Sequence, residues 1–197
     1  LALCREVLGG NLTKVIEFDL PVRNAQGDYQ TGVSDWHDAI AEAWKAACPP
    51  EPGVVALLVW GDPSLYDSTL RIAQRLAPMP PIKVIPGVTA LQALTAAHAI
   101  PLNEINAPVV LTTGRQLRDH GWPPGADTIA VMLDGNCSFQ HIDSSGVTIW
   151  WGAFLGLPNQ VLRHGALAET AADIIATRQA ARESHGWIMD TYLLRRA

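Results

Sequence analysis

Residues 54–68 read VVALLVWGDPSLYDS, and the interpretation of the whole chain starts from this stretch. Its first seven residues are all apolar, without polar alternation, which is typical of a strand covered on both faces in a parallel sheet. The run ends at Gly61-Asp62-Pro63, where small polar residues take over. We therefore expect a buried strand whose carboxyl end opens into a polar loop.

The same pattern, an apolar run followed by a turn, recurs in residues 84–90 (VIPGVTA) and 131–135 (VMLDG). In open α/β sheets, ligands bind outside the carboxyl ends of the strands. Three glycines in these turns would let the backbone approach a ligand closely: Gly61, Gly87 and Gly135. Each turn alone also fits an ordinary connection from a strand to a helix. Together they favour a pocket for a neutral or zwitterionic ligand with a flat ring.

Apolar strands and amphipathic helices alternate along the chain, which predicts an α/β layered fold. Strands are expected at 13–18, 54–60, 82–85, 109–113, 128–133, 147–154 and 186–194. Helices are expected at 35–47 after the cap Ser34, and at 67–77, 89–99 and 160–184, with loops at 21–32 and 115–127. A connector at 102–108 places a boundary near 104–108, between α/β domains at 1–105 and 106–197.

Composition excludes several classes of protein. The 197 residues are 48% hydrophobic and carry a net charge of −5, so overall electrostatics do not favour nucleic-acid binding. The longest apolar run is too short to span a bilayer, and no signal peptide is visible. Three widely spaced cysteines without CxxC suggest reduced thiols in a cytoplasmic protein. The histidines show no metal-ligand spacing, and no hydrolase, dinucleotide or P-loop signature occurs, so no metal is expected.

Five segments together resemble the tetrapyrrole methylase family: WGDPSLYDS, IPGVTA, VMLDG, WWGAFLGLPNQVLRHG and GWIMDTYLLRR. The resemblance runs from about Val7 to the last residue. It implies two αβα domains, with S-adenosylmethionine folded into the cleft between them and S-adenosylhomocysteine as its product. The YDS after GDP, the TTGR segment and the last motif resemble the family member that methylates C1 of precorrin-5 in aerobic cobalamin biosynthesis and releases the C20 acetyl group as acetate.

The resemblance also implies which residues bind the cofactor. Carried over motif by motif, they are Trp60, Gly61, Asp62, Leu65, Thr89, Ala90, Leu133, Asp134, Ile188 and Met189. Asp134 stands where related enzymes often have Met before Gly, so its contact is a departure in type. Ile188 and Met189 would flank the adenine. Thr89 begins a helix, and its hydroxyl would either cap that helix or face a ligand carboxylate.

Catalysis needs no protein nucleophile, because a sulfonium methyl is already electrophilic and alignment supplies much of the rate. Loss of the acetyl group needs water and a general base. Tyr66 and Asp67, directly after the GDP turn, are the first candidates near the methyl. They also fit a core aromatic and a helix cap. Asp190 lies on an apolar strand, where a carboxylate is costly unless it is partnered, which makes it a third candidate.

The implied substrate is a polycarboxylate tetrapyrrole, although the protein is acidic. Local arginines would have to hold it, because their guanidinium groups bind carboxylates bidentately. The candidates are Arg115, Arg118 and Arg163, and each also fits a solvated surface charge.

Three alternatives stay open: another tetrapyrrole methylase acting at a different ring position, a non-catalytic module that binds the cofactor or its product, and an unrelated nucleotide-binding α/β domain. Family members open with a Gly-rich GxGxGxP loop, which Gly9-Gly10 does not match. The chain opens LALCREVLGG without Met, so we expect a first strand, helix and second strand to precede it. Dimerisation is left open.

Overall fold

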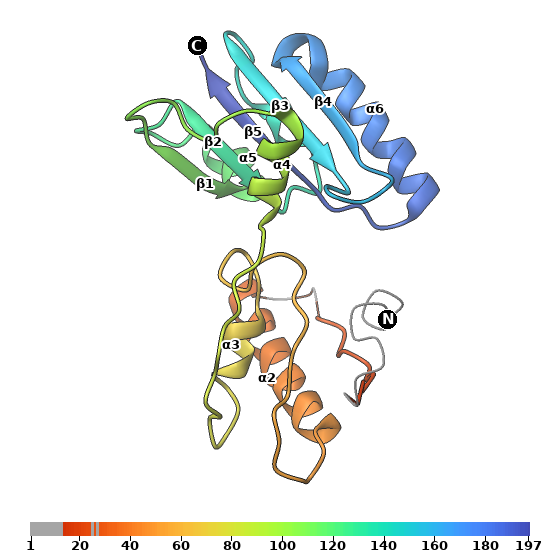
Figure 1. The fold of residues 1–197 in the computed structure, drawn as a ribbon. Helices are drawn as coiled ribbons and strands as arrows, with labels where there is room; N and C mark the ends of the chain where they lie inside the picture. Colours follow the sequence, from red (N-terminus) through yellow and green to blue (C-terminus); the bar gives the residue numbers. More distant parts are fainter. Residues whose placement is uncertain (1–13, 25, 27) are drawn as a thin grey trace. The chain divides into compact units, whose positions relative to one another are not determined.

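The computed structural model describes residues 14–24, 26 and 28–197, so Gly9-Gly10 and Thr13 lie outside the described residues. The chain divides into two compact units, Leu1–Pro86 and Gly87–Ala197 (Figure 1). This division falls upstream of the boundary near 104–108 that the sequence suggested, because helix α4 (Ala90–His98) packs on strands of the second unit.

The first unit is built on two helices, α2 (Tyr29–Ala47) and α3 (Thr69–Ala73). The α2 helix begins at Tyr29, so the prediction of a loop up to residue 32 and a cap at Ser34 was wrong. The Asp28 side chain caps the helix instead, because it accepts a hydrogen bond of 2.8 Å from the Thr31 amide. The helices bury a small core made of Ile40, Ala41, Trp44, Ile72 and Ala73.

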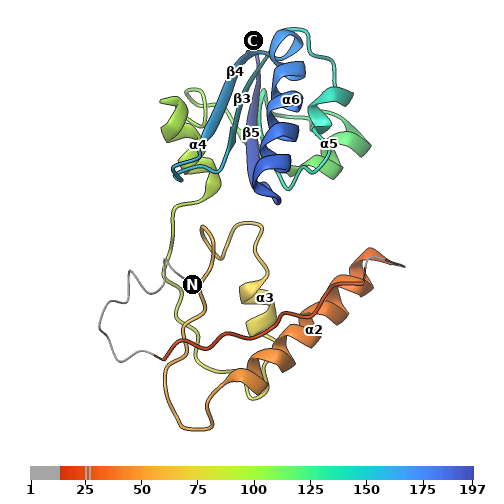
Figure 2. The same ribbon diagram turned by 90° about the vertical axis from the view of Figure 1, so that its right-hand side faces the viewer.

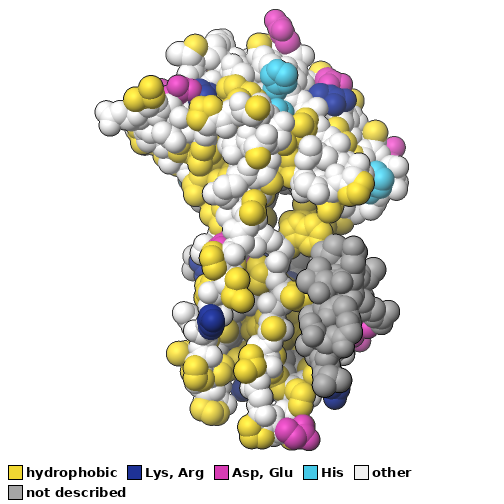
Figure 3. Space-filling view, in the orientation of Figure 1, with side chains coloured by type: hydrophobic (Ala, Val, Ile, Leu, Met, Phe, Trp, Pro, Cys, Tyr) yellow, Lys and Arg dark blue, Asp and Glu magenta, His cyan; other side chains and the backbone are white. Residues whose placement is uncertain are grey.

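Three predicted strands are not formed in the described residues. No strand structure is present at 54–60 or 82–85, nor at 14–18, the described part of the strand predicted at 13–18. The side chains of Val54, Leu58 and Ile85 are largely exposed, and hydrophobic side chains are seen across this unit in Figure 3. An apolar run specifies a preference for burial, but a strand forms only where a neighbouring strand accepts its hydrogen bonds. In the described part of the first unit these runs have no such neighbour.

The second unit is an α/β fold around a five-stranded mixed sheet, which confirms the predicted fold class. The strand order is β1-β2-β5-β3-β4. Their bounds are Val109–Thr113 for β1, Thr128–Met132 for β2, Val147–Ala153 for β3, Val161–Ala166 for β4 and Asp190–Arg196 for β5. β1 and β2 are parallel, and β5 is antiparallel to both β2 and β3. β1, β2 and β3 therefore run in the same direction.

Helices cover both faces of this sheet (Figure 2). The α4 helix lies on one face, and α5 (Gly114–His120) and α6 (Leu167–His185) lie on the other. The second face holds the main core, which includes Leu117, Ile129, Ile149, Trp151, Ile174, Tyr192 and Leu194. The expected strands at 109–113, 128–133 and 147–154 are confirmed within one residue at each end.

Other predictions for this unit were wrong. Residues 115–127 begin with helix α5 instead of a loop, because Thr113 caps a helix that buries Leu117 among otherwise polar residues. The single helix predicted at 160–184 is strand β4 followed by α6, since 161–166 pair with β3. The last strand begins at Asp190, not at residue 186, because Gly186 ends α6 with a positive φ of 77°.

Candidate functional site

One edge of the sheet brings together Leu133, Asp134 and residues 188–190 among the predicted site residues of the second unit. The carboxyl ends of β1, β2 and β3 meet there with the beginning of β5, since Thr113 pairs with Met132 and Ala153 pairs with Asp190. The loop after β2 and residues 188–190 consequently lie at this edge. This is the position where open α/β sheets bind ligands.

Leu133 and Met189 present apolar surface at this edge. The side chain of Leu133 is 67% exposed, and its backbone has a left-handed φ of 52°. Met189 is 41% exposed, and its carbonyl accepts a hydrogen bond from the Phe154 amide at 3.1 Å. Both side chains fit contact with a flat adenine ring. Ile188 is buried, so only its backbone is available to a ligand.

Asp134 is buried, and both oxygens of its carboxylate accept hydrogen bonds from other groups of the protein. Oδ2 accepts hydrogen bonds from the Ser138 amide at 2.5 Å and from the Tyr192 hydroxyl at 2.6 Å. Oδ1 accepts from the Ser138 hydroxyl at 2.8 Å and from the Asn136 amide at 3.1 Å. The side chain thus shapes the loop, and we expect any contact of Asp134 with a ligand to be made by its backbone.

Gly114 is a residue of this edge that the sequence analysis did not single out. It begins helix α5, and a Cβ placed on it would collide with the carboxylate of Asp134. Only glycine allows the helix to start this close to the loop. The TTGR segment carried the signal, a glycine at the junction of a strand and a helix, but its contact with Asp134 was not visible in the sequence.

Asp190 lies beside the same edge in a buried ion pair. Its carboxylate accepts from Arg178 Nε at 2.9 Å, from Arg178 Nη2 at 3.2 Å and from Trp151 Nε1 at 2.9 Å. The Asp190 and Arg178 side chains are 6% and 12% exposed. Burial raises the pKa of Asp190, while Arg178 and Trp151 oppose that rise. The partner that the sequence analysis required for this carboxylate is therefore Arg178.

Thr89 caps helix α4. Its hydroxyl accepts from the Gln92 amide, and the Gln92 side chain accepts from the Thr89 amide at 3.1 Å, which completes a capping box. Of the two roles that the sequence left open for this hydroxyl, the structure places it in the cap. Ala90 is the first residue of the helix and is half-buried.

The first unit carries the remaining predicted cofactor residues in the loop before α3. Trp60 is 67% exposed, and Gly61 has a φ of 95° that favours glycine. Asp62 folds the loop, because its carboxylate accepts from the Ser64 amide at 2.8 Å and from the Ser64 hydroxyl at 2.5 Å. The Leu65 amide donates to the Asp62 carbonyl at 3.2 Å.

Tyr66 and Asp67 continue this loop into α3. Tyr66 has a left-handed φ of 51°, an uncommon conformation for an aromatic residue, and partial burial raises the pKa of its phenol. Asp67 accepts a hydrogen bond of 2.6 Å from the Thr69 amide, but the N-cap residue of the helix is Ser68, so the bond closes a turn just before the helix. Ser68 contacts His37 of α2 at 2.9 Å and so fixes the loop to that helix.

The three candidate arginines lie on the second unit at separate elements. Arg115 and Arg118 are exposed residues of α5, and Arg118 pairs with Asp119 at 2.8 Å. Arg163 is on β4 and pairs with Asp173 at 2.5 Å. Both pairs are partly exposed, and such pairs are weak because water and salt screen them. Each arginine could therefore leave its partner for a carboxylate that binds it more strongly. Their role toward a polycarboxylate stays a prediction.

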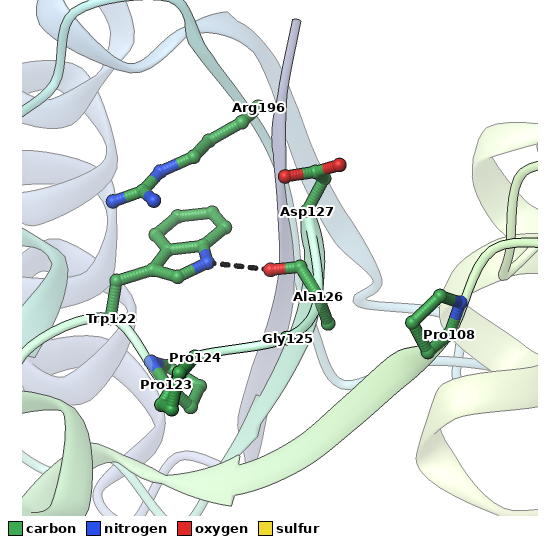
Figure 4. Close-up of a pocket in the computed structure, with 8 residues that line it drawn as sticks. All are labelled: Pro108, Trp122, Pro123, Pro124, Gly125, Ala126, Asp127 and Arg196. Carbon is green, nitrogen blue, oxygen red and sulfur yellow. Dashed lines mark hydrogen bonds between the residues drawn. The ribbon is translucent and has the colours of Figure 1, made fainter.

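A shallow hollow of about 360 Å³ lies at the opposite edge of the sheet (Figure 4). It is lined by Pro108, Trp122, Pro123, Pro124, Gly125, Ala126, Asp127 and Arg196. The Trp122 indole donates to the Ala126 carbonyl at 2.8 Å, and the Arg196 guanidinium lies 4.1 Å from the centre of its ring. None of the sequence-predicted site residues lines this hollow.

In residues 14–24, 26 and 28–197, no group of three or more His, Cys, Asp or Glu side chains is arranged to hold a metal ion. None of the helices in that part of the chain has the length and apolar character needed to cross a membrane.

Comparisons with known proteins bear on the whole chain. The family model of the Tetrapyrrole (Corrin/Porphyrin) Methylases matches residues 2–171. A precorrin-6A synthase [deacetylating] of Sinorhizobium sp. is 43% identical over 202 residues, which cover 98% of this chain and 77% of that protein. A precorrin-2 C(20)-methyltransferase of Sinorhizobium sp. is 40% identical over 76 residues, 39% of this chain and 31% of that protein.

Similar solved structures are consistent with the match to this family. The crystal structure of a cobalamin synthesis related protein (CobF) from Corynebacterium diphtheriae matches with a TM-score of 0.73 and 44% identity, over 85% of this chain and 73% of that one. A uroporphyrin-III C-methyltransferase from Thermus thermophilus shares the fold, with a TM-score of 0.52 and 22% identity over 84% and 67% of the two chains. Since the family model matches most of the sequence, the chain belongs to the tetrapyrrole (corrin/porphyrin) methylase family.

Proposed function

We propose that the chain is an S-adenosylmethionine-dependent C-methyltransferase of aerobic cobalamin biosynthesis, which converts precorrin-5 into precorrin-6A. The observation that carries this proposal is the 43% identity with a precorrin-6A synthase [deacetylating] over 98% of the chain. The segments that resemble the family supply its cofactor loops. A uroporphyrin-III C-methyltransferase from Thermus thermophilus has been solved with S-adenosylhomocysteine, the product of that cofactor.

The overall reaction forms one bond to carbon and removes an acyl group. When bound, S-adenosylmethionine supplies an electrophilic methyl group on a sulfonium, so the ring carbon C1 forms the new bond as the carbon–sulfur bond breaks. Water provides the oxygen of the acetate, and the bond that joins the acetyl carbon to the ring breaks, leaving its electron pair on the ring. The protein contributes orientation and proton transfer.

Each of these roles is assigned to particular described residues. Leu133 and Met189 offer exposed apolar surface to the adenine at the edge of the second unit. Tyr66 keeps its proton at neutral pH, since burial raises its pKa, and so acts as a hydrogen-bond donor. Asp67 is then the acceptor among the predicted catalytic residues. Asp190 is the weaker candidate for the base, because Arg178 and Trp151 already occupy its carboxylate.

The arginines that would hold the substrate carboxylates are Arg115, Arg118 and Arg163. Displacement of Asp119 or Asp173 by a stronger, bidentate partner would free the second and third of these. A cytoplasmic location and the absence of nucleic-acid and membrane partners also belong to this proposal, and a homodimer is left open.

The test is a product analysis with the full chain, precorrin-5 and S-adenosylmethionine. We expect S-adenosylhomocysteine, a tetrapyrrole with one added methyl, and released acetate. Methylation without acetate would favour another precorrin methylase, an alternative supported by the partial match to a precorrin-2 C(20)-methyltransferase. Binding of S-adenosylhomocysteine without turnover on any precorrin would indicate a non-catalytic module and overturn the proposal.

A further inference from the structure

The loop after β2 is held by a side chain from a different strand. Tyr192 lies on β5, is 1% exposed, and donates its hydroxyl hydrogen bond to Asp134 Oδ2 at 2.6 Å. Its ring packs edge-on against Phe139, with centroids 5.3 Å apart. Both contacts fix the phenol, so the position of its oxygen is determined by the core and not by solvent.

Asp134 links the Tyr192 hydroxyl to the loop by hydrogen bonds. Its two oxygens also accept from the Ser138 amide and hydroxyl and from the Asn136 amide, which closes the turn at residues 134–138. Burial, together with the negative charge of Asp134, raises the pKa of Tyr192 well above 10. The phenol therefore remains a hydrogen-bond donor at neutral pH.

The residue directly before Asp134 is in an unfavourable conformation. Leu133 has a φ of 52°, which is costly for a residue with a side chain, and its own side chain is 67% exposed. Packing of that side chain therefore does not compensate the cost, and the neighbouring bonds of Asp134 must hold the backbone. Such a conformation kept at a sheet edge is typical of a site where a ligand is bound.

We propose that Tyr192 is a positioning residue that, through Asp134, holds the backbone of Leu133 in the geometry that accepts the cofactor. This inference rests on the proposed function, because it assigns the loop to the cofactor. Gly114 closes the same loop from the side of α5, since a Cβ there would meet the Asp134 carboxylate. The loop is thus clamped between β5 and the start of α5.

The test is the variant Tyr192→Phe in the full chain, which removes the hydroxyl and keeps the ring in the core. We expect KM for S-adenosylmethionine to rise about tenfold, while kcat at saturating cofactor stays within about twofold. The Kd of S-adenosylhomocysteine, measured by titration calorimetry, should rise by the same factor. A purely structural role would not separate KM from kcat in this way.

Thr128→Val is the matched control. Thr128 is a buried residue at the other end of β2, and its hydroxyl accepts from Arg195 Nε at 3.1 Å. The variant also loses one partly buried hydrogen bond in the same sheet, but we expect it to leave KM and Kd unchanged. An equal rise of KM in both variants, or unchanged KM and Kd in Tyr192→Phe, would overturn the inference.

A second variant covers the case in which Tyr192→Phe does not fold. Ser138→Ala removes one of the donors to the same carboxylate and keeps the backbone amide, so we expect the Kd of S-adenosylhomocysteine to rise in the same direction. Unchanged affinity in this variant would contradict the inference. If the wild-type chain binds no S-adenosylhomocysteine, the proposed function itself fails, which is a different outcome from a wild type that binds and variants that bind equally well.

Discussion

Two ion pairs between a strand and α6 differ in how much they contribute to the stability of the fold. Asp190 and Arg178 are almost fully buried, whereas Arg163 and Asp173, which also join a strand to α6, are 37% and 59% exposed. Removing one partner of a buried pair leaves the other charge without compensation, whereas exposed pairs are weak because water and salt screen them. The structure therefore predicts a large loss of stability for one of two chemically similar substitutions and a small loss for the other.

Arg178→Met should lower the free energy of unfolding by roughly 3–5 kcal/mol, because it leaves the Asp190 carboxylate buried with Trp151 as its remaining donor. Arg163→Met, the matched control on β4, should cost less than about 1 kcal/mol. Urea titrations followed by tryptophan fluorescence measure both values. Equal losses in the two variants would show that the Asp190 pair does not carry the stability assigned to it.

At this scale, the sequence singled out Asp190 and Asp134 but could not show their partners. Asp190 was singled out because a carboxylate on an apolar strand needs a partner, and Arg178 is that partner. Asp134 was singled out by its place after a buried strand. Its contact with Tyr192 joins residues 58 positions apart in the chain, and only tertiary structure brings them together.

A hydrogen bond from His98 joins helix α4 to the sheet. His98 Nε2 donates to the Trp151 carbonyl at 3.0 Å, and the His164 ring of β4 lies 5.8 Å away. Burial and the neighbouring His164 lower the pKa of His98 below 6.5, although the bond to Trp151 opposes this. The folded protein thus binds fewer protons here than the unfolded chain does.

Because the folded pKa is lowered, the contribution of His98 to stability is complete above pH 6.5 and is lost as the pH falls below that value toward the folded pKa. His98→Gln keeps an amide donor for Trp151 and does not titrate, so we expect its stability to fall less between pH 7.5 and 5.5. Denaturant titrations at several pH values measure both slopes. His37 also has a lowered pKa, but it is present in both proteins and cancels in the difference. Parallel slopes would refute the assignment.

Strands and helices could be predicted from the sequence where local residues alone determine the secondary structure. The runs at 128–132 and 147–153 form central strands with neighbours on both sides, as their largely apolar sequences indicate. The run at 54–60 is entirely apolar but lacks strand partners in the described residues. β4 was read as helix because its residues are mixed in polarity and precede a genuine helix, and its pairing with β3 is non-local information.

At the scale of the whole molecule, the predicted cofactor-binding residues are found in both units. Trp60 in the first unit and Leu133 in the second are each 67% exposed, so their truncation to alanine removes little packing within the protein. If both side chains contact the bound nucleoside, either truncation loses buried apolar area on binding, at about 25 cal/mol per Å². Any loss of affinity then reports contact with the ligand instead of damage to the fold.

Trp60→Ala and Leu133→Ala should each raise the Kd of S-adenosylhomocysteine about tenfold, since a loss of about 1.4 kcal/mol corresponds to that factor. Calorimetry on the full chain measures the affinity. Thermal unfolding gives an independent reading, because ligand at 100 times its Kd adds about 2.7 kcal/mol to the stability of the protein that binds it. Met79→Ala is the control, an equally exposed apolar residue of the first unit that no cofactor motif includes, and it should bind as the wild type does. Wild-type affinity in Trp60→Ala beside weakened binding in Leu133→Ala would mean that the GDP loop does not reach the cofactor, and the assignment of residues 60–65 would fail.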